Sequence, residues 1–417
     1  MSSDPIVPAP DATADGADRL DAGRPFDAAI VGAGPSGSAM AILLARAGAR
    51  VALIDAGRFP RDKLCGEYLS PEGVGAVDRL VPDGRLARSG GRPIRSVRLT
   101  TPRGRVLEAE VAGPDGRAGL GLSRSALDAL LLDEARSLGV EVFEGIRVSG
   151  PIVAGGRVVG VSGRRESGRP VTAHASVILA ADGRHSALTR RSGATRPRSL
   201  PGLRPRLFGL KRHLIIADDA ADEPPGTVGL HLLPGGYVGA CRVEGGRTNL
   251  CGLLPERLSR QYRGDLDALA EATFPGNRTL AALWDAAQPT GPWKTVAGVR
   301  VETSSPLLPG IFYCGDARGT VDPLGGQGLT MAMLGAEVIA PFVLRTLAQR
   351  DLDLATLRAA QRAWHARFDR RVALCRAFHH ALVQPSLIDL ASLLGRGGNA
   401  LLSLGFTMTR DPARMLS

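Results

Sequence analysis

One segment near the N-terminus constrains the fold more than any other part of the chain: an apolar run, a glycine-rich turn, a helix-forming stretch and a second apolar run that ends in an acid. The first run, FDAAIV at residues 26–31, is typical of a strand buried on both faces of a parallel sheet. The turn GAGPSG follows at 32–37, and the Ala- and Leu-rich segment after it, to Ala47, has high helix propensity. The second run, VALI at 51–54, ends in Asp55. This order predicts a β–turn–α–β unit of about 30 residues.

Such a unit suits the two phosphates of a dinucleotide. A helix N-terminus offers unpaired N–H groups and about half a positive charge, which together receive a pyrophosphate. Gly32 permits the tight exit from the strand, Gly34 leaves space for the pyrophosphate, and Gly37 lets the helix pack closely on the sheet. Asp55 is placed to accept hydrogen bonds from ribose hydroxyls. The unit predicts a dinucleotide site, but by itself it does not choose between FAD and NAD(P).

Composition places the chain among ordinary globular proteins. The 417 residues are 44% hydrophobic and 22% charged, which excludes wholesale disorder. Arginine carries the net charge of +11, and because no block of consecutive basic residues occurs, we expect no nucleic-acid partner. The five cysteines have no CxxC spacing and the histidines have no ligand-spaced partners, so we expect neither a disulfide framework nor a metal. No uninterrupted apolar stretch reaches ~18 residues and no signal core precedes the first strand, so the expected location is cytoplasmic.

Further motifs along the chain carry a resemblance to a known family. They are FPRDKLCGEYLSP at 59–71, Ser-Arg with a following Leu-Asp at 123–128, ADGRHS at 181–186, YCGDA at 313–317 and DPLGGQGL at 322–329. In this order they resemble the stations of the superfamily that contains geranylgeranyl reductases, flavin halogenases and aromatic hydroxylases. The resemblance extends from about Phe26 to Leu347, the end of a long helix that is predicted to begin at Gly328.

The resemblance implies an FAD-dependent oxidoreductase whose cofactor is held by residues scattered through the chain. Arg124 is expected near the diphosphate, and Asp316 near the ribityl hydroxyls, to which a carboxylate bonds strongly. The helix that opens at Gly328 and Leu329 would direct backbone N–H groups towards the N1–C2=O edge of the flavin. The expected cofactor-binding residues are Gly32, Ala33, Gly34, Pro35, Ser36, Gly37, Asp55, Ala56, Arg61, Cys65, Gly66, Arg124, Val148, Asp182, Gly183, Gly315, Asp316, Gly325, Gly326, Gly328 and Leu329.

Several of these residues also have a purely structural interpretation. Asp182 and Asp316 could each close a turn, and Arg124 could cap a surface helix. Cys65 on its own is more often a small buried residue than a reactive one. Asp55 stands where the family more commonly has glutamate, so its shorter side chain changes the expected ribose contact.

The predicted architecture is α/β: a Rossmann-like FAD-binding domain, an inserted antiparallel sheet that binds the substrate, and C-terminal helices. Alternating residues with glycine-rich turns between 207 and 254 predict the inserted sheet. The expected boundaries are a disordered tail at 1–24, a discontinuous FAD-binding domain at 25–96, 118–197 and 296–347, a substrate domain at 97–117 and 198–295, and a C-terminal helical region at 348–417.

The motifs that the chain contains or lacks limit the possible electron donors and the possible reactions. No second strand–GxGxxG–helix unit occurs, so we expect NAD(P)H to bind transiently near the flavin, or an external reductase to deliver electrons. Halogenation is the least favoured chemistry, because Trp284, Trp293 and Trp364 are isolated and no lysine follows Gly66 until Lys211. A flavin-binding redox sensor and a flavin-free dehydrogenase are rival classes.

Two chemistries of the superfamily remain. A prenyl reductase of the geranylgeranyl type, which saturates C=C bonds, fits the Cys65–Gly66 station, but Gly239 stands where that branch has tryptophan. We narrowly favour a monooxygenase of secondary metabolism, which hydroxylates or epoxidises a phenolic, polyketide or lipid-like molecule through a flavin C4a-hydroperoxide. It needs water exclusion more than a strong acid or base. The segments 233–237 and 248–252 look like flavin oxidoreductases found with polyketide pathways.

The remaining predictions concern the substrate and the C-terminus. Lys211, His213 and Tyr237 are candidate substrate residues that face the flavin, and an exposed strand face is the alternative. An apolar stripe at helical spacing runs from Trp364 to Leu382 between arginines. We expect it to pack on the protein, with peripheral contact to an anionic membrane as the alternative. The sequence makes no prediction of the oligomeric state.

Overall fold

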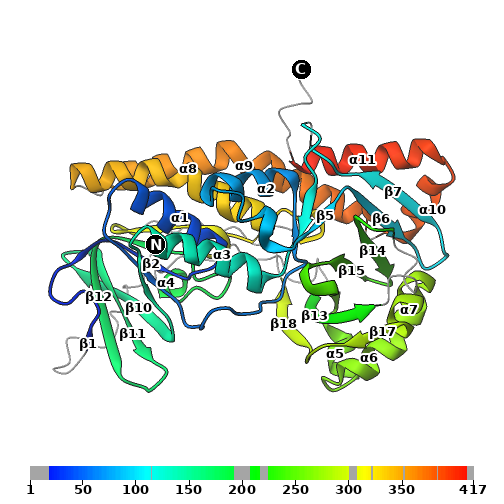
Figure 1. The fold of residues 1–417 in the computed structure, drawn as a ribbon, viewed down its shortest axis with the longest axis horizontal. Helices are drawn as coiled ribbons and strands as arrows, with labels where there is room; N and C mark the ends of the chain where they lie inside the picture. Colours follow the sequence, from blue (N-terminus) through cyan, green and yellow to red (C-terminus); the bar gives the residue numbers. More distant parts are fainter. Residues whose placement is uncertain are drawn as a thin grey trace, which may run out of the picture.

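Two large β-sheets lie side by side in the computed structural model, and long helices bridge them (Figure 1). The nucleotide-binding part lies at the left of that view and the second sheet at the right. The described residues are 18–113, 115–191, 207–216, 224–299, 308–320, 323–350, 353–382 and 384–410.

The first sheet combines a parallel part with an antiparallel ribbon. Its strands are β1 (Asp18–Arg19), β2 (Phe26–Val31), β3 (Val51–Ile54), β9 (Glu141–Phe143), β10 (Ile146–Ala154), β11 (Arg157–Arg165), β12 (Pro170–Ala180) and β19 (Ile311–Tyr313). The main order is β10-β11-β12-β2-β3-β9, and β1 and β19 also pair with β12. The first half of β12 pairs antiparallel with β11, and its second half pairs parallel with β2 and β19. One long strand therefore joins the ribbon to the parallel sheet.

Helices cover one face of the parallel strands and the ribbon covers the other. The helices of this part are α1 (Pro35–Arg46), α2 (Pro71–Leu80), α3 (Arg124–Ser137), α4 (Ala187–Arg191) and α8 (Gly328–Gln349). Ile30 and Leu53 belong to the cluster under α1, α3 and α8, whereas Val31 and Ile54 pack towards the ribbon. Strands buried on both faces explain the continuous apolar runs in the sequence.

The second sheet is antiparallel except for one parallel pair. Its order is β17-β13-β16-β15-β14-β6-β7, with β18 beside β13, and β14 and β6 run parallel. The strands are β6 (Ser96–Thr100), β7 (Val106–Glu110), β13 (Leu207–Ile216), β14 (Thr227–Leu233), β15 (Gly236–Arg242), β16 (Arg247–Pro255), β17 (Ala287–Pro289) and β18 (Lys294–Val299). A small sheet of β4 (Tyr68–Leu69), β8 (Gly119–Gly121) and β5 (Arg92–Ile94) stands apart from both.

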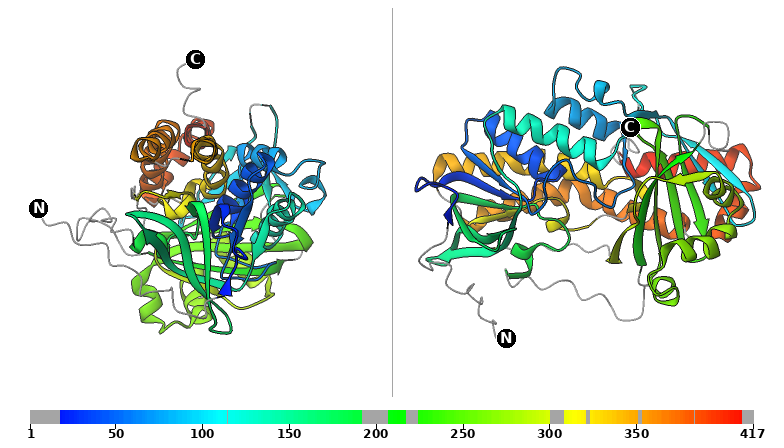
Figure 2. Two further views of the ribbon diagram at one scale, coloured as in Figure 1. Left: turned by 90° about the vertical axis from the view of Figure 1, so that its left-hand side faces the viewer. Right: turned by 60° about the horizontal axis from the view of Figure 1, so that its bottom comes forward.

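The second sheet also has a helical layer on one face. Residues of α5 (Glu256–Gln261), α6 (Leu266–Thr273) and α7 (Arg278–Asp285) pack on it. Its other face turns towards the C-terminal helices α9 (Leu354–Leu382), α10 (Pro385–Ser392) and α11 (Arg396–Arg410). Figure 2 shows from two further directions that α8 and α9 run alongside one another. The predicted fold class, a Rossmann-like domain with an antiparallel sheet and C-terminal helices, is confirmed.

The C-terminal stripe packs on the protein, as expected. Trp364, Phe368 and Val372 join the core under α8, and Leu382 joins the core of the second sheet. Helix α8 is itself long and apolar enough to cross a membrane by length and composition. However, half of its most apolar window is buried inside the protein. Its packing against α1 and α9 is that of a core helix.

Two predicted boundaries differ from the structure. Residues 18–24 of the expected tail are ordered, because β1 pairs with β12 and the buried Asp21 carboxylate accepts hydrogen bonds from Arg19, the Gly23 N–H and the His174 N–H. The boundary expected between 295 and 296 falls inside β18, which pairs with β13 of the second sheet. Residues 1–17, and residues 192–206 around the boundary expected at 197, lie outside the described part of the chain.

Candidate active site

A large cavity opens between the two sheets, at the carboxyl ends of the parallel strands. Its empty space, including the open mouth, is about 1520 Å³. The glycine turn, the 63–68 segment, the start of α8 and the inner face of the second sheet all contribute to the wall. The cavity therefore extends from the glycine turn to the second sheet.

Most of the predicted cofactor residues gather on this wall, although they are spread over almost 300 positions of sequence. Those that line it are Gly34, Pro35, Ser36, Cys65, Gly66, Arg124, Gly183, Gly315, Asp316, Gly325, Gly326, Gly328 and Leu329, and the candidate substrate residue Tyr237. Those that do not are Gly32, Ala33, Gly37, Asp55, Ala56, Arg61, Val148, Asp182, Lys211 and His213. Val148 instead borders a small hollow between β3 and the ribbon.

The glycines of the turn serve two purposes. Gly32 has φ +103°, and a Cβ there would lie 2.4 Å from the Ala181 carbonyl oxygen; at Gly37 it would lie 1.8 Å from the Gly32 carbonyl oxygen. Glycine is therefore required at both positions, because any larger residue would clash with the backbone. At Gly34, by contrast, a Cβ would approach only guanidinium ends, at 3.7 Å and 4.0 Å, and at Gly66 and Gly328 it would meet nothing within 4 Å. These three glycines keep the cavity open.

Asp55 holds the turn in place from the end of β3. Its Oδ2 accepts from the Ala33 N–H at 2.7 Å and from Arg61 at 3.1 Å, and its Oδ1 accepts from the Gly57 N–H at 2.7 Å. The carboxylate lies behind the wall rather than on it. Because each carboxylate oxygen can accept a further hydrogen bond, the ribose contact of Asp55 and the contact of the adjoining Ala56 stay predictions.

Three cations converge where the diphosphate is expected. Arg124 is buried and pairs with Asp128 through two hydrogen bonds of 2.8 Å and 2.7 Å, and Arg61 reaches the same glycine turn. Lys63 lines the cavity beside Gly183, and its pKa is lowered by desolvation and then by the charges of Arg124 and Arg61. An anion bound among these groups would relieve their repulsion. Lys63 was not among the predicted site residues, although it lies within the 59–71 motif.

An unsatisfied polar group marks the same end of the cavity. The Ser36 hydroxyl lies on the first turn of α1, is buried, and has no hydrogen-bond partner among the described residues. Phosphate oxygens at a helix N-terminus would satisfy such a hydroxyl together with the free N–H groups. The open glycines, the converging cations and this orphan hydroxyl fit an FAD diphosphate.

The two later acids play different parts. Asp316 is exposed on the cavity wall directly after β19. Asp182 is off the wall, and its Oδ2 accepts from the Ala187 N–H at the start of α4, which agrees with the turn-closing interpretation. Its neighbour Gly183, with φ +80°, lines the cavity instead. Asp322 of the last motif lies outside the described residues.

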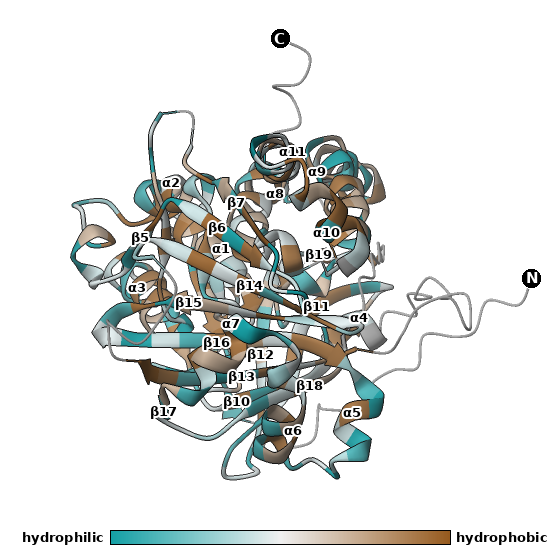
Figure 3. Ribbon diagram, turned by 90° about the vertical axis from the view of Figure 1, so that its right-hand side faces the viewer, coloured by the Kyte–Doolittle hydropathy of each residue, from teal (hydrophilic) through white to brown (hydrophobic). Residues whose placement is uncertain are grey.

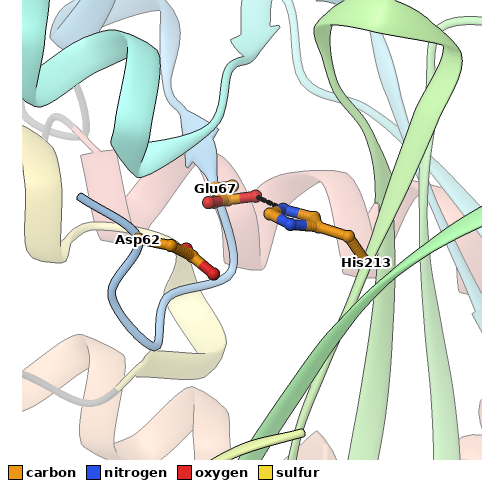
Figure 4. A group of neighbouring side chains, drawn as sticks. All are labelled: Asp62, Glu67 and His213. Carbon is orange, nitrogen blue, oxygen red and sulfur yellow. Dashed lines mark hydrogen bonds and ion pairs between the residues drawn. The ribbon is translucent and has the colours of Figure 1, made fainter. Parts of the chain in front are cut away.

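Lys211 and His213 do not face the flavin position, contrary to the expectation for them. They project from β13 onto the 62–67 segment, where Lys211 Nζ contacts both Asp62 and Glu67 Oε1, the latter at 2.6 Å. His213 Nε2 lies 2.7 Å from Glu67 Oε2 (Figure 4). Burial acts to lower the pKa of Lys211, but the two carboxylates raise it above its ordinary value. The buried Glu67 carboxylate and the half-buried Asp62 carboxylate beside β13 require this cation.

The same geometry bears on metal binding. Atoms of Asp62, Glu67 and His213 lie within 4.8 Å of one another and could in principle hold an ion. In this structure the ammonium of Lys211, which is 1% exposed, bonds to both carboxylates. Glu67 also accepts from the Arg124 N–H at 2.8 Å and has a left-handed backbone, φ +57°. The cluster therefore fixes the Cys65–Glu67 part of the cavity wall. Sequence reasoning missed Glu67, whose signal was its place in the CGE motif.

The far end of the cavity is apolar. It is built by β6, β14, β15, β16 and α11, with Val97, Val228, Leu230, Tyr237, Leu253 and Phe406 on the wall. Among the lining residues that these described elements contribute, none is Asp, Glu, Lys or Arg. The thiol of Cys251 also lies there, and burial raises its pKa well above the ordinary range. This end suits an uncharged, apolar substrate.

Comparison with known proteins agrees with the geometry. A family model described as "FAD binding domain" matches residues 26–226. The chain is 30% identical over 328 residues to a menaquinone reductase of Mycolicibacterium smegmatis, covering 73% of this chain and 72% of that protein. It is 26% identical over 350 residues to a digeranylgeranylglycerophospholipid reductase of Methanoculleus marisnigri, covering 82% of each.

Solved structures share the whole architecture. A geranylgeranyl bacteriochlorophyll reductase-like protein of Thermoplasma acidophilum superposes with a TM-score of 0.75 at 19% identity, covering 95% of this chain and 98% of that one. Solved flavin-dependent halogenases have the same fold. The expected cofactor, FAD, is thereby confirmed. The chain belongs to the FAD-dependent oxidoreductases of the geranylgeranyl reductase and flavin halogenase superfamily.

Proposed function

We propose that this protein is an FAD-dependent reductase that saturates C=C bonds in the isoprenoid part of a lipid-like molecule. The observation that carries the proposal is the apolar far end of the cavity, which adjoins the expected flavin position and has no charged lining residue among the described ones. A prenyl chain carries no group that would need one. The reductases among the relatives support the same chemistry.

The residues of this chain would bind and enclose the reactants. FAD, when reduced, supplies a hydride equivalent, and with one proton this converts an alkene to an alkane. Gly34, Ser36 and Arg124 would hold the diphosphate, and Asp316 the ribityl chain. The second sheet and α11 would exclude water and align the prenyl chain with the flavin ring. Reducing equivalents would come from NAD(P)H or from an external reductase, because no second nucleotide fold occurs among the described residues.

Oxygenation is the second candidate, and one position favours it. Gly239 lies on the cavity wall where prenyl reductases have tryptophan, so no side chain fills the cavity at this position. A monooxygenase acting on a phenolic or polyketide molecule would use the wider space for a ring. Halogenation is supported least, because Lys211 is held by two carboxylates. Lys63, the other lysine near the cofactor, lies beside Gly183 among the cations expected to hold the diphosphate.

One experiment separates these candidates. The purified holoenzyme is reduced with dithionite without oxygen and mixed with geranylgeranylated lipids, and the visible absorbance of oxidised flavin is followed. The proposal expects anaerobic reoxidation of the flavin and a product that has gained two hydrogen atoms. Reoxidation that requires oxygen, with a product that has gained one oxygen atom, would establish the monooxygenase instead.

A further inference from the structure

Helices α10 and α11 and the turn between them carry six exposed leucines. The exposed fraction is 52% for Leu387, 62% for Leu390, 66% for Leu393, 61% for Leu394, 55% for Leu401 and 51% for Leu404. Together these six, here called the leucine surface, expose roughly 600 Å² of apolar area, the upper end of the range for the largest patch on a typical monomer. They are distinct from the α9 stripe, which is buried.

Sequence spacing shows that the outward orientation belongs to the helices themselves. Leu387 and Leu390 recur at i, i+3 on α10, and Leu401 and Leu404 recur at i, i+3 on α11. Leu393 and Leu394 lie on the turn that joins the two helices. Each helix also has an inner face, with Ile388 on α10 and Phe406 on α11 buried against the second sheet. Both helices are therefore apolar on two opposite sides. Packing within the protein accounts for the apolar residues of the inner side, but not for those of the outer side.

Exposed arginines lie beside the leucine surface. Asp389 is the only acid of the two helices, and it is already bound to Thr101 at 2.7 Å and to Arg103 at 3.2 Å. Arg396 lies exposed at the start of α11. Arg103 and Arg105 are exposed on the turn between β6 and β7, which the Asp389 pair holds against α10. Glu108 and Glu110 on β7 are exposed acids at this edge, and the Glu108 N–H donates to the Asn399 side chain.

The leucine surface also lies next to the cavity. Phe406 is on the cavity wall, and it belongs to the same helix as Leu401 and Leu404, on its other side. Only one helix diameter, about 10 Å, separates the outer surface from the apolar end of the cavity. Figures 1 and 3 show α10 and α11 at this end of the molecule, above β6 and β14; in Figure 3 the hydrophobic colour is strong along α10.

We propose that the leucine surface docks on an anionic lipid bilayer. Leucines that enter the acyl boundary, with arginines beside them at the level of the head groups, are the pattern of helices that lie in a membrane interface. The inference does not depend on which reaction the enzyme catalyses.

Vesicle flotation of the full-length holoenzyme tests the proposal. Vesicles of phosphatidylcholine with about one-third phosphatidylglycerol are expected to carry the protein upwards, and pure phosphatidylcholine vesicles to carry several-fold less. A triple variant, Leu390→Gln, Leu394→Gln and Leu401→Gln, should lose at least tenfold of the binding, and Arg396→Glu should lose part of it. The matched control is Val153→Gln with Ile215→Gln, two exposed apolar residues on other elements, which should bind as the parent does.

Two further measurements keep the outcome clear. The flavin spectrum and the unfolding midpoint of the triple variant must equal those of the parent, since none of the three leucines lines the cavity. Binding that is absent for the parent, or unchanged in the triple variant, overturns the proposal. So does a concentration-dependent dimer that the triple variant abolishes, because a second copy would then be the occupant.

Discussion

Replacing Lys211 by Met should destabilise the protein far more than a substitution on an exposed strand face would. The substitution keeps the length of the side chain and removes its charge, which leaves the fully buried Glu67 without its cation. Removing one partner of a buried ion pair costs about 3–5 kcal/mol. Because Glu67 keeps the Arg124 N–H and His213, we expect the lower end, about 3 kcal/mol.

The measurement is urea unfolding of the holoenzyme with FAD in excess, at pH 7. The matched control is Lys294→Met, whose ammonium is 42% exposed and 4.0 Å from Asp62, and which should change stability by less than about 0.5 kcal/mol. The double variant Lys211→Met with Glu67→Gln should recover part of the loss, because no buried charge is then left unpaired. If Lys211→Met is no more destabilising than Lys294→Met, the ion-pair account of the Cys65–Glu67 wall is refuted.

Three further predictions test the cofactor site and the ordered N-terminal segment. Asp316→Ala should weaken FAD binding about tenfold or more with little change in the unfolding midpoint, since a hydrogen bond to a charged group contributes about 1.5–3 kcal/mol; unchanged affinity in a flavin-fluorescence titration contradicts the ribityl contact. Gly34→Val should abolish FAD binding in a protein that still folds by circular dichroism, whereas Gly32→Val should impair folding itself, because its Cβ would lie 2.4 Å from a carbonyl oxygen. Burial acts to raise the pKa of Asp21, but hydrogen bonds from Arg19, Gly23 and His174 lower it from 3.8 to about 2. Asp21→Asn should therefore lower the free energy of unfolding by about 2 kcal/mol at pH 7, and this difference should shrink as the pH falls from about 4 towards 2. Equal pH dependence of the two proteins in urea unfolding would rule out this role.

Local sequence determined the elements whose signals are short-range. The β2–α1–β3 unit, the α8 helix and the strands of the inserted sheet lie close to where periodicity, glycine turns and helix propensity predict them. The resemblance to the family's ordered motifs, rather than these local signals, implied which loops meet. For that reason Ser36, Arg124 and Asp316, far apart in sequence, were expected at one cofactor and lie on one cavity.

Only the tertiary structure decided the roles that depend on distant partners. Lys211 and Glu67 are 144 positions apart, and nothing in either segment reveals that one neutralises the other. Asp182 has the sequence of a cofactor ligand, yet it caps α4 and leaves the wall to Gly183. The stripe on α9 and the leucines on α10 and α11 have similar helical spacing, but one is covered by the core and the other is exposed. Periodicity reports that a face is apolar, whereas the packing of the whole chain decides what, if anything, covers it.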